Sequence, residues 1–295
     1  MRIVILSDHA ETTLTKRAVQ RERDYERKLA AYNEERRQWK EKNLLIMEHM
    51  ADQFRHGLLW GAAKHLWRLL KRLANPGPAE PAKQLPDETD AIWAAGKEGQ
   101  DMLITYLKER LDDTWTLYCG YCNGRGEIDA LLVGPDGFFA MEIKHINGII
   151  SCDGGNWWRD RKDSSGCIIA EHVPISDRTG RSPSRQLTEP AEVLDRYIAG
   201  HIEGYPSRKM VIITHPSAEL GSFESLEINS IKLLEDWDVP EAFEHLRTPI
   251  PMLELELINE LILKSHQYHK MRRSIRSQKT DGQRHILQKT SGGLI

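Results

Sequence analysis

The N-terminal quarter of the chain opens with a long, highly charged stretch in which apolar side chains recur at helical spacing. In residues 11–42, 17 of 32 positions are charged and none is Gly or Pro. A seven-residue apolar interval places its members on one stripe of a helix. That stripe consists of Ala18, Tyr25, Tyr32, Trp39 and Ile46. The other seam position of a coiled coil is charged here, at Arg21, Lys28 and Glu35. The pattern therefore predicts half a coiled coil or, preferably, a charged helix that rests its aromatic stripe on another element.

Residues 44–73 form a second helical pattern, with Met, Phe, Ala and Leu at three- and four-residue steps. Its polar side carries Lys64, Arg68, Lys71 and Arg72, which makes the predicted helix amphipathic. One interpretation is a helical hairpin with the first helix, which would serve oligomerisation or docking of a partner protein. The other is a basic face lying on a membrane surface. The acidic Glu48 and Asp52 favour the hairpin.

A proline-rich stretch separates these helices from the rest of the chain. Prolines at positions 76, 78, 81 and 86 exclude both a continuous helix and a central strand. We therefore expect a helical region over residues 1–74 and a linker over 75–88. A central domain is expected over 89–216, and a helical extension with a basic tail over 217–295.

The periodicity of the central domain changes several times. Residues 90–112 have helical spacing, and Ser182 followed by Pro183 predicts the start of a second helix that ends near Ala199. Short apolar or alternating runs bounded by turn sequences predict strands. These runs are 116–119, 128–133, 138–143, 149–152, 167–170 and 210–214. The order of helix, strands, helix and strand predicts an α/β domain with one mixed sheet.

Composition narrows the class of protein. The 295 residues include 41 Lys and Arg against 44 Asp and Glu, and the mean hydropathy is −0.54. No apolar run is long enough for a membrane span, so an integral membrane protein is not expected. Four cysteines do not make a disulfide scaffold, which suggests a reducing, cytoplasmic setting. The middle of the chain is acidic, whereas eight basic residues and only Asp281 follow from Lys264 onward.

Two carboxylates and a lysine form the most informative chemical pattern. Gly126-Glu127-Ile128-Asp129 leads into one predicted strand, and Glu142-Ile143-Lys144 lies in the next. Strand side chains alternate, so Glu142 and Lys144 point the same way. If the turn at residues 134–137 pairs the strands, Asp129 comes to lie beside Glu142. Two close carboxylates repel each other unless a cation lies between them.

This pattern suits metal-dependent hydrolysis of phosphodiester bonds. Asp129 and Glu142 would hold Mg²⁺, with Mn²⁺ as an alternative, and the Lys144 ammonium would orient the attacking water. Glu98, on the preceding helix, could point at the same place. The triplet alone is weak, because surface carboxylates and salt bridges produce such patterns by chance.

Six short motifs follow one another between about residues 93 and 214. They are Ala95-Gly96-Lys97-Glu98-Gly99, Gly126-Glu127-Ile128-Asp129, Val133-Gly134-Pro135-Asp136-Gly137, Met141-Glu142-Ile143-Lys144, Cys152-Asp153-Gly154-Gly155-Asn156-Trp157-Trp158 and Arg181-Ser182-Pro183-Ser184-Arg185-Gln186-Leu187. In this order they resemble the nuclease-related domain (NERD), a branch of the PD-(D/E)xK nuclease superfamily. The resemblance implies a restriction-endonuclease-like fold and Mg²⁺-dependent cleavage of nucleic acid. It implies core catalytic positions at Asp129, Glu142 and Lys144. Glu98 would support the metal, and Gln186 would help to place the water or phosphate.

Basic side chains suggest where nucleic acid binds. Arg178, Arg181 and Arg185 cluster near Gln186 and are candidate phosphate contacts. The tail from Lys270 is expected to aid non-specific binding as a partly disordered extension. The pair Cys119 and Cys122 mimics a zinc knuckle but lacks a second pair, so buried strand cysteines are preferred.

The combined expectation is a cytoplasmic, Mg²⁺-dependent nuclease that acts preferentially on DNA. Two alternatives stay open. One is a nucleic-acid-binding or scaffold protein built on an inactive nuclease fold. The other is a peripheral membrane-associated protein anchored through residues 57–73.

Overall fold

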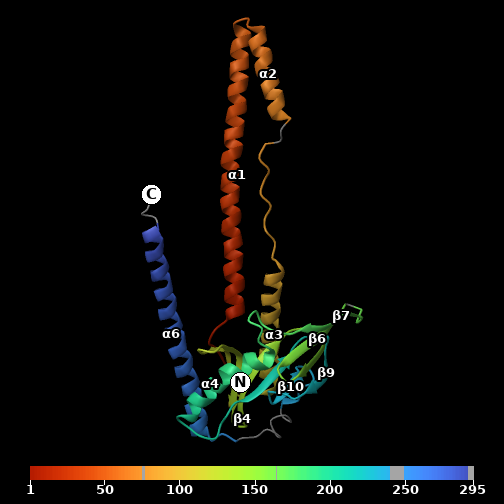
Figure 1. The fold of residues 1–295 in the computed structure, drawn as a ribbon, viewed down its shortest axis with the longest axis vertical. Coiled ribbons are helices and arrows are strands. Elements are labelled where there is room, and N and C mark those ends of the chain that lie inside the picture. The colour runs from red at the N-terminus through yellow and green to blue at the C-terminus, as the bar shows by residue number, and fades with distance from the viewer. Residues whose placement is uncertain (75–76, 164, 240–248, 292–295) are drawn as a thin grey trace. The chain divides into compact units, whose positions relative to one another are not determined.

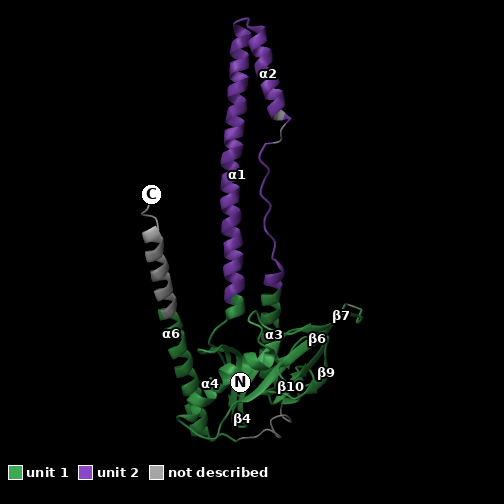
Figure 2. Cartoon of the chain, viewed as in Figure 1, with its two compact units in different colours: residues 1–11, 92–295 green, residues 12–91 purple. Residues whose placement is uncertain are grey.

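The computed structural model describes residues 1–74, 77–163, 165–239 and 249–291, with side chains described up to residue 275. The chain divides into two compact units (Figures 1 and 2). Unit 1 combines residues 1–11 with residues 92–295, and unit 2 consists of residues 12–91. Unit 2 is therefore inserted in the sequence between the first strand of unit 1 and the rest of that unit.

Unit 1 is built on a six-stranded mixed sheet in the order β1-β2-β3-β4-β8-β10. Strands β2 (Thr116–Cys122), β3 (Glu127–Gly134) and β4 (Gly137–Lys144) form an antiparallel meander. Strand β8 (Arg208–Ile213) pairs parallel to β4, and β10 (Ser230–Leu233) pairs parallel to β8. Helices α3 (Glu88–Arg110) and α4 (Pro183–Ala199) precede the meander and β8. This arrangement confirms the predicted restriction-endonuclease-like mixed sheet flanked by helices.

A second sheet corrects the expectation of a single one. It has four strands in the order β7-β6-β5-β9. Two of them, β5 (Gly148–Asp153) and β7 (Ile168–Pro174), were predicted as strands but assigned to the one sheet. The intervening β6 (Asn156–Lys162) was missed, because Arg159, Asp160 and Arg161 give it no apolar alternation. β9 (Ala218–Glu224) pairs parallel to β5 and completes this sheet.

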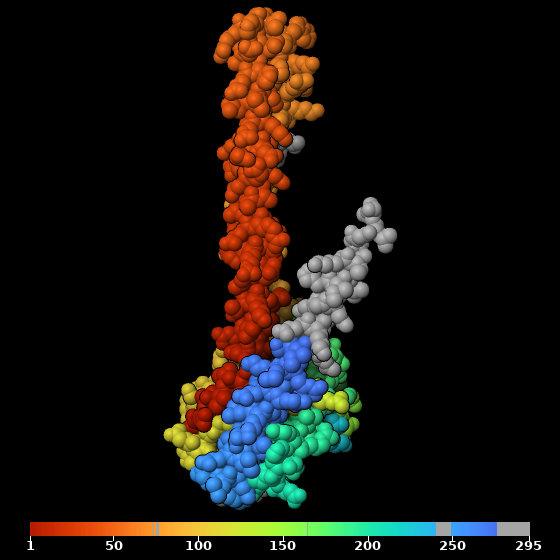
Figure 3. Space-filling view, turned by 90° about the vertical axis from the view of Figure 1, so that its left-hand side faces the viewer, coloured from red at the N-terminus to blue at the C-terminus, as the bar shows by residue number. Residues whose placement is uncertain are grey.

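Alternating side chains give the main sheet an apolar layer on each face. One face presents Leu132, Phe139 and Met141, which pack with Leu103 and Leu107 of α3. The opposite face presents Leu131 and Ala140, which share a core with α4 and α6 (Met252–Ser291). Figure 3 shows the described part of α6, in blue, lying along this side of unit 1. Both faces are buried, as the near-continuous apolar strands require.

The two ends of unit 1 depart from the sequence expectations. Residues Arg2–Ile5 form β1, which pairs parallel to β2. Residues 217–233, expected to begin a helical extension, instead supply β9 and β10 before α6. The basic tail was expected to be partly disordered, yet Lys270–Ile275 continue α6, and Arg273 donates a 2.8 Å hydrogen bond to the Asn123 carbonyl. The side chains of the remaining tail residues lie outside those described.

Unit 2 is a helical hairpin with an extended return. Helix α1 (His9–Arg55) continues past the expected end of the first helix, and α2 (Leu59–Leu73) follows a turn at Gly57. The return segment runs along α1, where the Trp39 ring lies 3.4 Å from the Cβ position of Gly77, and Lys83 pairs with Glu22 at 2.8 Å. The half-buried aromatic stripe of α1 thus rests on another element of the same chain. In the described residues, no helix is long and apolar enough to cross a membrane.

Candidate active site

The two carboxylates predicted to meet lie on adjacent strands, where the β3–β4 ladder opens. The last paired residues there are Ala130 and Met141, which leaves Asp129 and Glu142 one position further along. The Asp129 carboxylate accepts a 2.8 Å hydrogen bond from the backbone N–H of Ile143. Asp129 therefore takes the ladder position that a backbone carbonyl would otherwise fill. Asp129 thus contacts the strand segment that carries Glu142, next to the position at which the sequence predicts the two carboxylates to meet.

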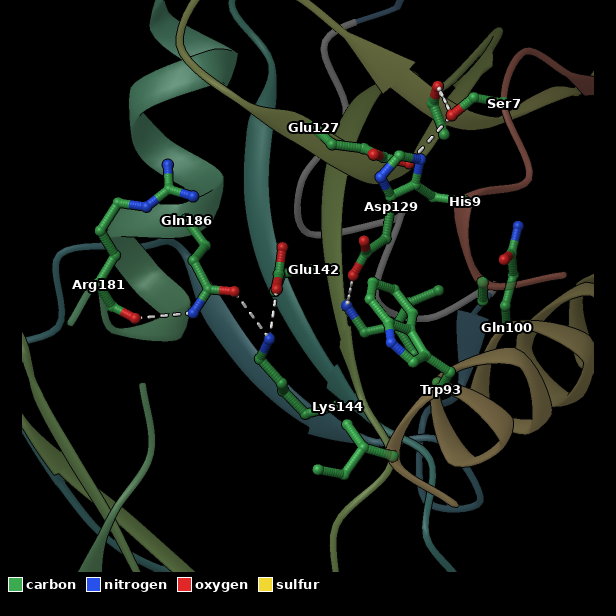
Figure 4. Close-up of a pocket in the computed structure, with 15 residues that line it drawn as sticks. Ser7, His9, Trp93, Gln100, Glu127, Asp129, Glu142, Lys144, Arg181 and Gln186 are labelled. Carbon is green, nitrogen blue, oxygen red and sulfur yellow. Dashed lines mark hydrogen bonds and ion pairs between the residues drawn. The ribbon is translucent and has the colours of Figure 1, made fainter. Parts of the chain in front are cut away.

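Lys144 and Gln186 complete a connected polar group with Glu142 (Figure 4). Lys144 Nζ lies 2.5 Å from Glu142 Oε1 and donates to Gln186 Oε1 at 3.0 Å. Glu142 and Lys144 share the sheet face that α4 covers, as their spacing of two predicts. Met141 belongs to the core on the α3 side. The structure thus brings Asp129, Glu142, Lys144 and Gln186 together.

Gln186 reaches this group because of how α4 begins. Ser182 is the N-cap, its side chain accepts from the Arg185 N–H, and Pro183 occupies the first turn, as the sequence predicts. The Gln186 amide N–H₂ donates to the Arg181 carbonyl at 2.8 Å. With its nitrogen held in this way, the amide presents its oxygen to Lys144. Gln186 therefore links the Lys144 ammonium to the start of α4 through its two hydrogen bonds.

These side chains line a cavity of about 420 Å³. Its wall also includes residues that the sequence analysis did not identify, drawn in Figure 4: Ser7, His9, Trp93, Gln100 and Glu127. The Ser7 hydroxyl lies 3.0 Å from the Gly120 carbonyl and 3.1 Å from Glu127 Oε1. Gly120 has φ +72°, and a Cβ there would lie 2.1 Å from the Ser7 carbonyl oxygen. Only glycine permits this approach of the N-terminal segment to β2.

One of the missed residues had a local signal. Glu127 and Asp129 are two apart in a strand, so alternation places both on the cavity side. Ser7 and His9 had none, because β1 pairs with a strand more than one hundred residues later. Periodicity identifies the run Ile3-Val4-Ile5-Leu6 as apolar but does not identify its partner.

Glu98 is not brought to the other catalytic candidates, which corrects the expectation drawn from its helix position. Its side chain is 67% exposed and lies 3.7 Å from His145 Nε2. The cavity face of α3 instead presents Trp93, Gly96 and Gln100. At 100° per residue, Glu98 lies about 200° around the helix from Gly96. Among the described residues, Glu98 therefore makes no contact with the cavity through which it would support a metal ion.

Burial and like charge shape the electrostatics of the site. Burial, together with the nearby Glu142 carboxylate, raises the pKa of Asp129 to about 8. Burial also raises the pKa of Glu142, although the Lys144 ammonium offsets part of that effect. Burial acts to lower the pKa of Lys144, but the Glu142 and Asp129 carboxylates outweigh it and the pKa is raised. Burial is thus the main cause of the raised pKa at both carboxyl groups, and it disfavours the ionised form of Asp129.

Two carboxylates of the cavity, Asp129 and Glu142, are the candidate ligands for a divalent ion. Among the described side chains, no three His, Cys, Asp or Glu residues are grouped to hold one metal ion. Mg²⁺ is commonly held by one or two protein carboxylates, with waters and substrate phosphates as the other ligands. Asp129 and Glu142 supply two buried carboxylates that line the same cavity, and burial is the main cause of their raised pKa values. The residues present therefore fit a Mg²⁺ ion held largely by water and substrate.

The three arginine candidates differ in their surroundings. Arg181 lines the cavity and pairs with Asp177 at 2.8 Å. Arg185 is exposed on the first turn of α4 and pairs with Glu189 at 3.2 Å. Arg178 is exposed in the loop before α4. Arg181 therefore has the most direct access to a substrate in the cavity.

The cysteine pair has a structural role. Cys119 and Cys122 are buried in β2, and burial raises the pKa of both thiols, to about 11 for Cys119. Cys122 lies beside the Ser7 hydroxyl, 3.9 Å away. Neither environment favours the thiolate that zinc requires. The preferred interpretation of buried strand cysteines agrees with this burial.

The fold and the carboxylate–lysine group define the class of domain to which this region belongs. The family model for the nuclease-related domain matches residues 95–214. This stretch is therefore a nuclease-related domain, and it contains every strand and helix that carries the carboxylate–lysine group. No curated protein matches the chain. No solved structure matches it either.

Proposed function

We propose that the chain is a metal-dependent nuclease that hydrolyses phosphodiester bonds of nucleic acid, with DNA as the preferred substrate. The observation that carries the proposal is the meeting of Asp129, Glu142 and Lys144 in one cavity. The family match supports a nuclease-related function for the same residues. Mg²⁺ is the proposed ion, with Mn²⁺ as a substitute.

Each residue has a defined task in this proposal. Asp129 and Glu142 would hold the ion, which would supply a more acidic water and offset phosphate charge. Lys144 orients the attacking water and stabilises the additional negative charge on the phosphate. Gln186 keeps the Lys144 ammonium in place through its 3.0 Å hydrogen bond. Arg181, with Arg178 and Arg185 on the surface beside it, contacts flanking phosphates.

The setting proposed for this activity is the cytoplasm. All four cysteines are free thiols, and three of them are buried. Free thiols without disulfides suit a reducing compartment.

The direct test is cleavage of circular and linear DNA, and of RNA, by the purified full-length chain with Mg²⁺, Mn²⁺ or EDTA. We expect metal-dependent product that is lost in Glu142→Gln and Lys144→Ala. Glu192→Gln, an exposed carboxylate on α4, is the matched control and is expected to cleave normally. Salt-sensitive DNA binding with no metal-dependent product would overturn the proposal and leave a binding protein on an inactive fold.

A further inference from the structure

Helix α2 of unit 2 exposes a row of large apolar side chains. Trp60 is 92% exposed, Trp67 70% and Leu59 66%. Leu66 and Leu70 are also exposed, as are Phe54 and Leu58 at the turn that precedes the helix. Single exposed apolar residues are common, but a contiguous group of this size marks an interaction surface.

The exposed row is not the face that forms the hairpin. Ala62 and Leu69 are the buried residues of α2, His65 stacks on His49 of α1 at 5.9 Å, and a Cβ at Gly61 would meet the Gln53 side chain. At 100° per residue, Leu59, Leu66, Trp67 and Leu70 fall on a different arc from these residues. Packing against α1, visible in Figure 1, therefore leaves the tryptophan face available.

The basic residues beside this apolar face indicate which kind of ligand it would bind. Lys64, Arg68 and Lys71 flank the two tryptophans, and α2 contains four basic and no acidic residues. Tryptophan beside lysine, next to a leucine face, is the composition of helices that lie in a membrane interface. The acidic Glu48 and Asp52, which argued against membrane contact in the sequence, belong to α1, and Asp52 lies 3.5 Å from His56.

We propose that α2 is a peripheral docking surface for anionic phospholipid bilayers. The leucine and tryptophan side chains enter the boundary between headgroups and acyl chains, and the basic flank binds the lipid phosphates. Fifteen residues make a helix of about 22 Å, which is too short to span the bilayer, so the helix lies along the surface. The surface belongs to unit 2, and the proposal is independent of nuclease activity.

The test is cosedimentation of the full-length chain with vesicles of phosphatidylcholine alone or mixed with phosphatidylglycerol in equal parts. We expect binding to the anionic vesicles only, weakening with added salt, and a blue shift of tryptophan emission. The double variant Trp60→Ser/Trp67→Ser should bind the anionic vesicles at least about tenfold more weakly than the original chain. Lys64→Glu/Lys71→Glu should remove the preference for anionic lipid.

Two controls separate docking from loss of fold. Leu253→Ser changes a side chain that is 81% exposed in unit 1, and it should bind vesicles like the original chain. Helix content by circular dichroism should be unchanged in all variants, because every substituted side chain is exposed.

Three outcomes would overturn the lipid proposal. The first is equal binding to both vesicle types, and the second is binding that the tryptophan variant does not weaken. The third is a chain that binds no vesicles and is a dimer by light scattering, while the tryptophan variant is a monomer. That result would assign the surface to contact with a second copy of the chain.

Discussion

The two units of this chain depart in opposite ways from the usual placement of apolar residues inside and charged residues outside. Unit 1 places carboxylates and an ammonium at a position where strands otherwise bury apolar side chains, as Asp129, Glu142 and Lys144 show. Unit 2 places Trp60 and Trp67 in solvent, where a surface helix otherwise carries polar groups. Each exception costs stability and calls for a ligand that offsets it. The ligand proposed for unit 1 is a cation, and the one proposed for unit 2 is the apolar phase of a bilayer.

The largest expected effect is on the rate of DNA cleavage, which should depend on Lys144 of unit 1 and not on the exposed tryptophans of unit 2. Lys144→Ala should lower the rate of DNA cleavage by about 10²–10³-fold or more, since it removes the charge that stabilises the developing phosphate oxyanion. Initial rates on a supercoiled plasmid with Mg²⁺ measure the loss. Trp60→Ser/Trp67→Ser should cleave in solution at the original rate. A similar loss of cleavage in both variants would remove the distinction between the units.

A smaller effect is expected at Gln186. Gln186→Ala should lower kcat about tenfold with little change in KM, because the Lys144 ammonium loses a partner that positions it. Gln186→Glu should recover part of the rate, since it restores an acceptor for the ammonium. An unchanged kcat in Gln186→Ala would show that Glu142 alone positions Lys144.

Stability should respond to pH through Asp129. Its raised pKa of about 8 means that, between about pH 4 and pH 8, the folded state holds a proton that the unfolded state releases. Metal-free protein should therefore lose stability as the pH rises through that window. Asp129→Asn keeps an acceptor for the Ile143 N–H, and in EDTA at pH 8.5 it should raise Tm by about 2–4 °C for each kcal/mol recovered.

Thermal unfolding of both forms at pH 5 and pH 8.5 measures this effect. The difference between them should shrink at pH 5, where Asp129 is protonated in the folded state. A lower Tm in Asp129→Asn at pH 8.5 would contradict the raised pKa of Asp129.

The smallest expected effect is at Glu98. Because its carboxylate faces His145 rather than the cavity, Glu98→Gln should change the cleavage rate by less than about threefold. The same plasmid assay measures it. A loss comparable to that of Lys144→Ala would restore the metal-support role that the resemblance implies.

Local spacing was enough to predict the centre of the site. Glu142 and Lys144 are two residues apart, and a tight turn links β3 to β4, so alternation and pairing fix their neighbours. The start of α4 was equally readable from Ser182 and Pro183. These features depend on contacts between residues that are close in sequence or joined by a short turn.

The pairing of strands that are far apart in the sequence could not be predicted from local spacing. The second sheet depends on β9 joining β5 in parallel across some seventy residues, and no periodicity encodes that choice. The orientation of Glu98 depends on the rotation of α3 about its axis. That rotation is fixed in part by close packing at Gly99, where a Cβ would lie 2.7 Å from Thr214 Oγ1. Tertiary contacts set both outcomes.

The parallel pairing of β1 with β2 has a consequence for synthesis of the chain. Arg2 pairs with Thr116, so the first strand leaves the ribosome more than one hundred residues before the strand that it joins. At 5–20 residues per second, that interval is roughly 6–23 s. Throughout it, the apolar run Ile3-Val4-Ile5-Leu6 lacks its sheet partner, and the highly charged helix that follows is expected to oppose its aggregation.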